Sequence, residues 1–178
     1  RLQSDEDYYG KFGKQYLSNS DIGTLLNNPT QFGQPRDTTL PMILGRYFHT
    51  LMLEPEKIKD FKICEASTRT TNIFKDLVKD FDRDNIVLSK EDEQMRFLTS
   101  EIKKNLFFNE LIYDKDNKFE EPAIGEIGGV MWKGKADIVT RDLIVDLKTS
   151  GDIDNFKWSA RKYNYDSQAW VYNQLFGK

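Results

Sequence analysis

The spacing of apolar residues changes its period at about residue 118, and this change limits the possible folds more than any other feature. Before it, apolar residues recur every three or four positions, as in 41–53, which is typical of helices with one buried face. After it, apolar and polar residues tend to alternate, as in 130–139, which is typical of strands. We therefore expect one domain over 1–178, with a helical part at about 1–110 and a sheet part at about 118–178.

The expected elements follow from these periods and from the turn residues beside them. Helices are predicted at 20–27, 41–53, 74–81, 90–105, 155–163 and 166–176, and strands at 122–127, 130–139 and 143–147. Gly128-Gly129 suits a tight turn between the first two strands, and Arg141-Asp142 suits a two-residue turn between the last two. Helices and strands segregated in this way predict an α+β fold, or an α/β fold if C-terminal strands follow Lys178.

Composition excludes several classes of protein. The chain is 38% hydrophobic and 13% aromatic, which is too apolar for a disordered chain, and no apolar run approaches the roughly 20 residues of a membrane span. The single cysteine, Cys64, excludes an internal disulfide and a thiolate-bound iron–sulfur cluster. It fits a small buried residue in a reducing, cytoplasmic compartment.

The net charge of −3 argues against a broadly basic nucleic-acid binder. It still leaves room for local basic groups around a centre of carboxylates. The candidates are Arg69, Lys75 and Lys79, then Lys133 and Lys135, then Arg161 and Lys162. A set scattered in this way is also typical of a solvated face.

Two aspartates are brought together by the second turn. With Arg141-Asp142 as a two-residue loop, the antiparallel register places Asp137 opposite Asp146. The same register places Lys135 opposite Lys148, and all four side chains then share one face of the hairpin. Directly opposed residues have Cβ atoms about 4.5–5.5 Å apart, so the two carboxylates are expected to be close.

Close carboxylates repel each other unless a cation lies between them. Mg²⁺ prefers oxygen ligands and binds through one or two carboxylates together with substrate phosphate. A lysine on the same face, here Lys148, can orient an attacking water or stabilise charge that develops on the phosphate. These groups fit metal-assisted phosphodiester hydrolysis. The alternative is an exposed strand face on which lysines only pair with aspartates.

Three further residues have both a functional and a structural interpretation. His49 is the single histidine, on a helix rich in Leu, Met and Phe, where it is either a metal ligand or a hydrogen-bonded core residue. Gln168 and Tyr172 are four residues apart and share one helix face. They either touch a site or lie at the boundary of the core.

Taken together, these residues form a series of motifs in a fixed order. The segments are Ser18-Asn19-Ser20-Asp21, Gly45-Arg46-Tyr47-Phe48-His49, Leu53-Glu54-Pro55, Thr68-Arg69-Thr70, Gly134-Lys135-Ala136-Asp137, Asp146-Leu147-Lys148-Thr149 and Gln168-Ala169-Trp170-Val171-Tyr172. The series spans nearly the whole chain. It resembles the PD-(D/E)xK nuclease superfamily, and within it the RecE- and RecB-like phage exonucleases of the lambda-exonuclease branch.

The resemblance implies a restriction-endonuclease-like fold, in which a central mixed sheet is flanked by helices and preceded by a helical part. It implies that Asp137, Asp146, the backbone carbonyl of Leu147 and the imidazole of His49 bind metal. Lys148 is then the catalytic lysine, and Gln168 and Tyr172 orient the site or contact DNA. An acid on the preceding strand often assists in such folds, and we expect Glu121 in this role, with Glu120 as the second choice.

The activity implied by the resemblance is that of a metal-dependent deoxyribonuclease. We expect a double-strand exonuclease of the phage recombination or DNA degradation type, with one or two Mg²⁺ or Mn²⁺ ions per site and no iron–sulfur cluster. Its expected partners are linear double-stranded DNA, further copies of the chain in a ring-like trimer or tetramer, and a single-strand annealing protein. Its expected location is the host cytoplasm. The alternatives are an endonuclease or junction resolvase on the same core, or a catalytically silent DNA-binding subunit.

Overall fold

Helices and strands are segregated along the chain as the apolar periods predict. The computed structural model describes residues 2–178, and its mixture of helices and sheets confirms the α+β fold class. The chain forms two units: unit 1 holds residues up to Pro35, Asp116–Asp146 and Ser150–Lys178, and unit 2 holds Arg36–Lys115 and Leu147–Thr149. Among the helices described in residues 2–178, none has the length and hydropathy that crossing a membrane requires.

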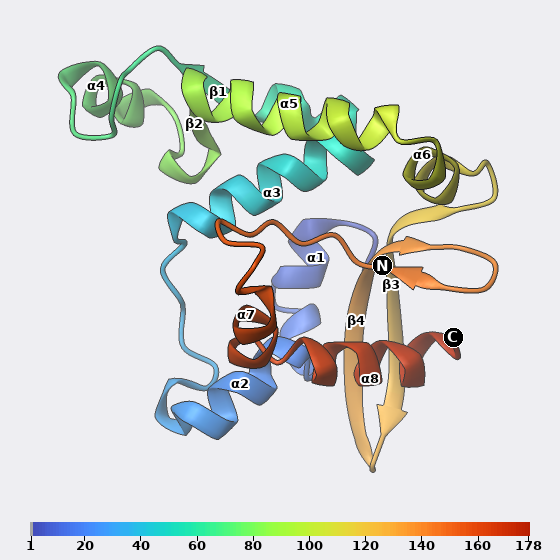
Figure 1. Ribbon diagram of the computed structural model, residues 1–178. Coiled ribbons are helices and arrows are strands. Elements are labelled where there is room, and N and C mark those ends of the chain that lie inside the picture. Colours follow the sequence, from blue (N-terminus) through green and yellow to red (C-terminus); the bar gives the residue numbers. More distant parts are fainter. Residues whose placement is uncertain (1) are drawn as a thin grey trace. The chain divides into compact units, whose positions relative to one another are not determined.

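The sheet of unit 1 is an antiparallel meander. Its strands are β3 (Lys118–Ile127), β4 (Val130–Val139) and β5 (Ile144–Val145), in the order β3-β4-β5 (Figure 1). The tight turn predicted at Gly128-Gly129 is confirmed, because Ile127 pairs with Val130 and both glycines have positive φ values, 61° and 78°. Such values are required at both positions of a type I′ turn and are natural for glycine.

The helices of unit 1 come from both ends of the chain. They are α1 (Asp5–Tyr9), α2 (Asn19–Asn27), α7 (Phe156–Lys162) and α8 (Tyr165–Phe176). Helix α2 begins earlier than predicted because Ser18, rather than Ser20 or Asp21, is its N-cap; the Ser18 amide donates to Asp21 Oδ2 at 2.8 Å. Short 3₁₀ turns lie at Gly13–Gln15 and Pro29–Gln31.

Helix α8 lies against β3 and β4 at a place where the strands carry glycine. A Cβ atom on Gly134 would come within 2.9 Å of Leu175 Cδ1 and 3.0 Å of the Tyr172 ring, and one on Gly125 would come within 3.0 Å of Leu175. The two glycines therefore allow a close approach between helix and sheet. This approach sets the distance from α8 to the residues that follow Gly134 on β4.

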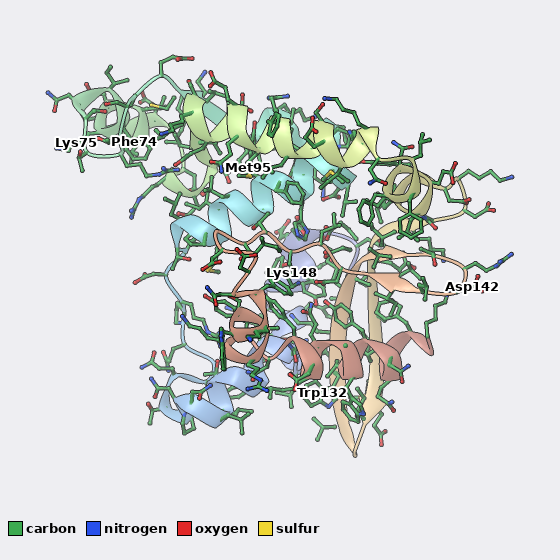
Figure 2. All side chains as sticks on the ribbon, viewed as in Figure 1. Phe74, Lys75, Met95, Trp132, Asp142 and Lys148 are labelled. Carbon is green, nitrogen blue, oxygen red and sulfur yellow. The ribbon has the colours of Figure 1, made fainter. Side chains whose placement is uncertain are left out.

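Unit 2 is mostly helical. It contains α3 (Leu40–Leu53), α4 (Asn72–Asp80), α5 (Ser89–Lys104), α6 (Leu106–Tyr113), the parallel strands β1 (Lys62–Cys64) and β2 (Ile86–Leu88), and 3₁₀ turns at Pro55–Asp60 and Arg83–Asn85. Helices α3 and α5 pack against each other (Figure 1), and Met95 of α5 is buried (Figure 2).

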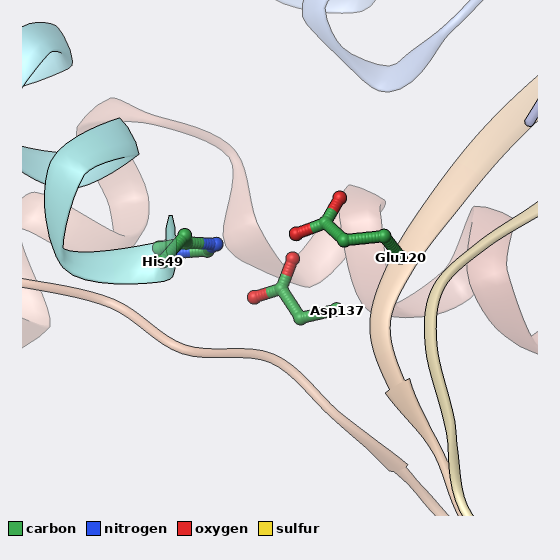
Figure 3. A group of neighbouring side chains, drawn as sticks. All are labelled: His49, Glu120 and Asp137. Atoms are coloured by element: carbon green, nitrogen blue, oxygen red, sulfur yellow. The ribbon is translucent and has the colours of Figure 1, made fainter. Parts of the chain in front are cut away.

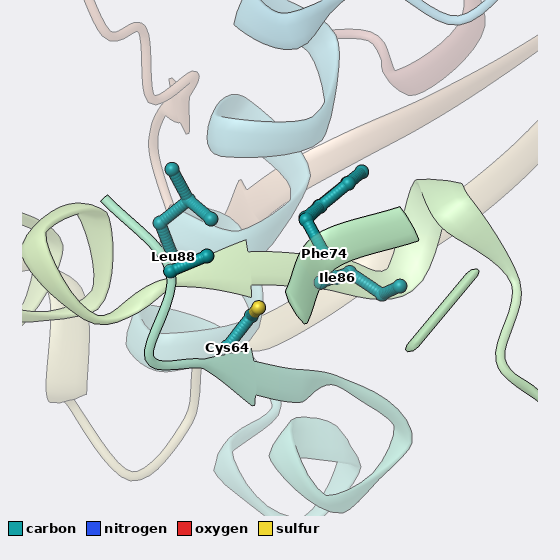
Figure 4. Close-up of a cluster of buried hydrophobic side chains, with 5 residues drawn as sticks. Cys64, Phe74, Ile86 and Leu88 are labelled. Carbon is teal, nitrogen blue, oxygen red and sulfur yellow. The ribbon is translucent and has the colours of Figure 1, made fainter. Parts of the chain in front are cut away.

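A small hydrophobic core joins the strands of unit 2 to α4. Cys64 and Ile86 lie on the paired strands, Phe74 comes from α4, and all three are buried (Figure 4). Ala66 and Leu88 complete the cluster. Cys64 is 2% exposed, so its predicted role as a small buried residue is confirmed. Helix α4 thus connects and covers a parallel strand pair, which needs such a crossover.

Replacing Gly134 by valine tests the close approach of α8. We expect the free energy of unfolding to fall by about 1–3 kcal/mol, because the new side chain overpacks against Leu175 and Tyr172. The matched control is Gly151→Val, since a Cβ atom on Gly151 would meet nothing within 4 Å. Urea denaturation of both variants measures the difference, and equal stability would show that α8 does not depend on the glycine.

Candidate metal centre and active site

The hairpin between β4 and β5 has the predicted register. Ile138 pairs with Val145 and Val139 with Ile144, and the amide of Thr140 donates to the carbonyl of Leu143 at 2.9 Å. The Thr140 hydroxyl also accepts from the amides of the turn, which lies at Arg141-Asp142 (Figure 2 labels Asp142). The two-residue turn is therefore confirmed.

Continued by one residue, this register puts Asp137 opposite Asp146. Strand β5 ends at Val145, so Asp146 follows directly after the last paired residue. Asp137 is buried, with 8% of its surface exposed, and Asp146 is half-buried. Burial makes both carboxylates costly to leave without compensating partners.

Glu120 joins Asp137 from the neighbouring strand. The pairs Phe119–Ile138 and Glu121–Ala136 lie on either side, so Glu120 is opposite Asp137. The two carboxylates reach toward each other, with ligand oxygens within 4.8 Å (Figure 3, which also labels His49). Glu120 has φ 48°, an unusual backbone conformation for a residue other than glycine, and such residues cluster at functional sites.

Glu120, rather than Glu121, therefore lies beside Asp137. The Glu121 carboxylate is 3.6 Å from Lys118 Nζ, and neighbouring strand residues point to opposite faces. The choice between Glu120 and Glu121 could have been made from the sequence alone. Glu120 precedes Ile127 by seven residues and Asp137 follows Val130 by seven, so counting outward from the Gly128-Gly129 turn pairs the two acids.

Lys135 balances the charge of this pair of acids. Its Nζ lies 3.2 Å from Glu120 Oε2 and 2.6 Å from Asp5 Oδ1, and its side chain is 8% exposed. The rings of Tyr8 and Tyr9 lie 5.6 and 5.9 Å from the same Nζ. Burial alone would lower the pKa of Lys135, but the hydrogen bond to Asp5 and the attraction of Glu120 raise it, so the side chain stays charged.

The expected pairing of Lys135 with Lys148 is not formed. The ladder between β4 and β5 stops at Val145, and Lys135 pairs with Pro122 on the other side of β4. The physical reason is that Lys135 finds two carboxylates, Glu120 and Asp5, whereas opposed lysines would repel each other. The sequence analysis did not predict α1, which supplies Asp5.

Helix α8 brings Gln168 and Tyr172 to the same carboxylates. Gln168 Nε2 donates to Asp146 Oδ1 at 3.0 Å and to the Tyr172 hydroxyl at 3.2 Å. The Tyr172 hydroxyl donates to the backbone carbonyl of Lys135 at 2.7 Å. Burial raises the pKa of Tyr172, and the charges of Asp146 and Asp137 add to this effect, so the phenol stays protonated as a donor.

His49 has a partner within unit 2. Its Nε2 lies 2.9 Å from the backbone carbonyl oxygen of Leu147, which accepts the bond. One helical turn earlier, a Cβ atom on Gly45 would lie 3.8 Å from Thr149 Oγ1. Residues four apart share a helix face, so α3 holds the segment 147–149 through a small residue and an imidazole. The Gly45-x-x-x-His49 spacing thus has a structural explanation.

Lys148 lies within this same segment. It is half-buried, between Leu147, which His49 binds, and Thr149, which faces Gly45 (Figure 2 labels Lys148). Leu147 is also the residue that follows Asp146. In the sequence, Lys148 is therefore the second residue after Asp146.

Comparison with known proteins gives one family. No curated protein matches the sequence. A family model matches residues 24–178 and is described as a PDDEXK-like domain of unknown function. The match covers all the candidate residues from His49 to Tyr172, and it supports the predicted PD-(D/E)xK superfamily. The chain therefore belongs to the family of PDDEXK-like domains of unknown function, DUF3799.

Proposed function

We propose that the protein is a metal-dependent deoxyribonuclease that hydrolyses phosphodiester bonds in DNA. The observation that carries the proposal is the meeting of Glu120 and Asp137 on neighbouring strands, with Asp146 opposite Asp137 in the extended register and hydrogen-bonded by Gln168. The PDDEXK-like family supports a nuclease. The carboxylates can bind a divalent cation, and the cation can in turn bind a phosphate group of the substrate.

The donor chemistry of these residues fits a divalent cation. Glu120, Asp137 and Asp146 supply carboxylate oxygens, which Mg²⁺ and Mn²⁺ prefer. The Leu147 carbonyl and the His49 imidazole are the further ligands we propose. Their 2.9 Å separation is close to the roughly 3 Å edge between neighbouring ligands held at about 2.1 Å, and His49 would have to give up the Nε2 proton that it donates to Leu147. A bound cation would polarise the phosphate and neutralise its charge.

The protein's own residues would orient the substrate and the water. Lys148, an ammonium with three donors and no acceptor, would hydrogen bond to the attacking water or to a phosphate oxygen. Gln168 and Tyr172 would keep Asp146 and β4 in place, as their hydrogen bonds to Asp146 and to the Lys135 carbonyl support. Lys135 would hold the Glu120 carboxylate in place beside Asp137. Hydrolysis then transfers a hydroxyl to phosphorus and a proton to the leaving oxygen.

We further propose an exonuclease on linear double-stranded DNA, using one or two Mg²⁺ or Mn²⁺ ions. Support comes from the RecE-like order of the motifs around His49, Lys148 and Tyr172. A ring-like trimer or tetramer and a single-strand annealing partner belong to the same proposal. An endonuclease or junction resolvase on this core would differ in cutting a covalently closed circle, and a silent DNA-binding subunit would cut neither substrate.

The function is tested with an end-labelled linear duplex and a covalently closed circle. With Mg²⁺, we expect nucleotides to be released from the duplex while the circle stays intact, and no release with chelator. Asp146→Asn should keep its fold by circular dichroism and lose about 100-fold or more in rate, because loss of even an outer partner of a metal costs 10–100-fold. A folded Asp146→Asn protein with wild-type rate would remove Asp146 from the site.

Lys148→Ala separates catalysis from metal binding. We expect kcat to fall by about 10²–10³-fold, the cost of losing one donor to developing charge. The affinity for Mn²⁺, measured by calorimetry, should stay within a few-fold of wild type, because an ammonium cannot be a ligand. If Lys148→Ala loses metal as Asp146→Asn does, the division of roles between Lys148 and Asp146 is wrong.

The neighbouring glutamates offer a matched pair of variants. Glu120→Gln should weaken Mn²⁺ binding by about 10-fold or more, since it removes a charge beside Asp137. Glu121→Gln should change it little, because that carboxylate lies near Lys118. Calorimetric titration of both variants with Mn²⁺ shows which of the two glutamates binds the metal. A larger loss in Glu121→Gln would restore the assignment made from sequence.

A further inference from the structure

The segment Phe156–Tyr165 has a composition unlike the rest of the chain. It contains α7 and its junction to α8, and it carries three cations and no acid in a protein of net charge −3. The cations are Lys157, Arg161 and Lys162, and the aromatic residues are Phe156, Trp158, Tyr163 and Tyr165. The nuclease proposal gives none of these residues a role.

The structure places the cations over exposed rings. Trp158 is 56% exposed, with Lys157 Nζ at 5.3 Å and the Arg161 guanidinium at 5.5 Å from its ring centre. Tyr163 is 55% exposed, and Lys162 Nζ lies 5.3 Å from its ring. Each exposed ring therefore has a positive charge over it in a cation–π contact, which a stacking base would have to displace, and we call these five residues the α7 patch.

The α7 patch is held firmly at its junction with α8. The rings of Tyr163 and Tyr165 are stacked at 6.0 Å with an angle of 26°, and Phe156 lies 5.9 Å from Tyr165. Between the helices, Asn164 has φ 53°, and its carbonyl accepts from the Asn19 side chain at 3.3 Å. The junction beside the patch is thus packed and hydrogen-bonded within unit 1.

The same junction leads directly to the candidate active site. Helix α8 begins at Tyr165, and within its first turn Gln168 donates to Asp146. The α7 patch and the carboxylates are therefore in one unit and joined by one helix. A chain bound by the patch would lie next to the start of α8, the helix whose Gln168 donates to Asp146.

Flat exposed rings flanked by cations suit unpaired nucleotides. Bases stack on aromatic side chains only when they are released from the duplex, while the cations neutralise the adjacent phosphates. Surface cation–π pairs alone would account for the contacts, but not for two highly exposed rings, three cations and no acid within one short segment. An acidic peptide would match the charge and leave the rings unused.

We propose that the α7 patch binds single-stranded DNA, with bases stacked on Trp158 and Tyr163 and phosphates beside Lys157, Arg161 and Lys162. The inference rests on the proposed function for the choice of DNA, and it gives the nuclease a binding site for an unpaired strand near its active site. Because stacking and charge act without cleavage, the binding is measurable with no metal present.

Fluorescence anisotropy with a labelled twelve-nucleotide thymidine strand in chelator is the test. Trp158→Ala should weaken binding about 5- to 150-fold, the range for loss of one stacked base. The matched control is Trp170→Ala, since Trp170 is 53% exposed on α8. Trp158→Phe should regain much of the affinity. Equal affinities of Trp158→Ala and wild type would overturn the proposal.

Two further probes separate stacking from charge. An abasic strand of the same length should bind weakly and equally to wild type and Trp158→Ala, because it has no bases to stack. The triple variant Lys157→Gln, Arg161→Gln, Lys162→Gln should reduce the slope of log affinity against log salt by about 2, at roughly 0.7 per phosphate contact. A Trp158→Ala effect on the abasic strand, or stronger binding of a polyglutamate peptide than of DNA, would contradict single-strand recognition.

The experiments distinguish failure of the single-strand binding proposal from failure of the nuclease proposal. If the wild-type protein cuts DNA with Mg²⁺ but Trp158→Ala binds like wild type, the α7 patch is wrong and the nuclease stands. If the strand binds through Trp158 and no divalent cation supports cleavage, the patch stands and the nuclease is wrong.

Discussion

Charge balance at Lys135 is the interaction on which the arrangement of the candidate site depends. Burying Glu120 beside Asp137 would be costly without a cation, because carboxylates lose their hydration and repel each other. The Lys135 ammonium lies between Glu120 and Asp5; its side chain is buried and Glu120 is largely so, so their attraction offsets the cost of burying both charges, while Asp5 stays exposed. The same residue uses its backbone carbonyl to hold Tyr172. One residue of β4 therefore connects β3, α1 and α8.

A second constraint is the close contact of α8 with the sheet. The glycines opposite Leu175 let the helix approach, and this approach carries Gln168 to Asp146 and Tyr172 to the carbonyl of Lys135. Both side chains are half-buried and make directed hydrogen bonds there. Their hydrogen bonds are directed at groups that a cation and a phosphate would also require in fixed positions.

Elements whose structure depends on nearby residues could be predicted from the sequence. The register of β4 and β5 follows from a two-residue turn at Arg141-Asp142, and α3 follows from its apolar period. Short elements were missed: β1 and β2 have three residues each and form only by pairing between residues 24 positions apart, such as Lys62 and Ile86. Helix α6 was missed because its apolar residues surround it, which obscures the period.

The position of the two aspartates could be predicted from the sequence, but the residues that contact them could be predicted only in part. Asp137 and Asp146 follow from turn counting, and the same counting from Gly128-Gly129 would have selected Glu120 over Glu121. The ion pair of Lys135 with Asp5 was beyond reach, because nothing local to α1 specifies a partner 130 residues away.

That separation has a consequence for synthesis on the ribosome. Asp5 emerges before its partner Lys135, which follows 130 residues later, and Tyr172 is 37 residues further still. At about 5–20 residues per second, Asp5 waits roughly 7–26 s for Lys135. Throughout that time the chain lacks Asp137 and Asp146 as well. The candidate site is therefore assembled only when synthesis has passed α8, so a growing chain that carries α1 and α3 would have no means to cut the nucleic acid around it.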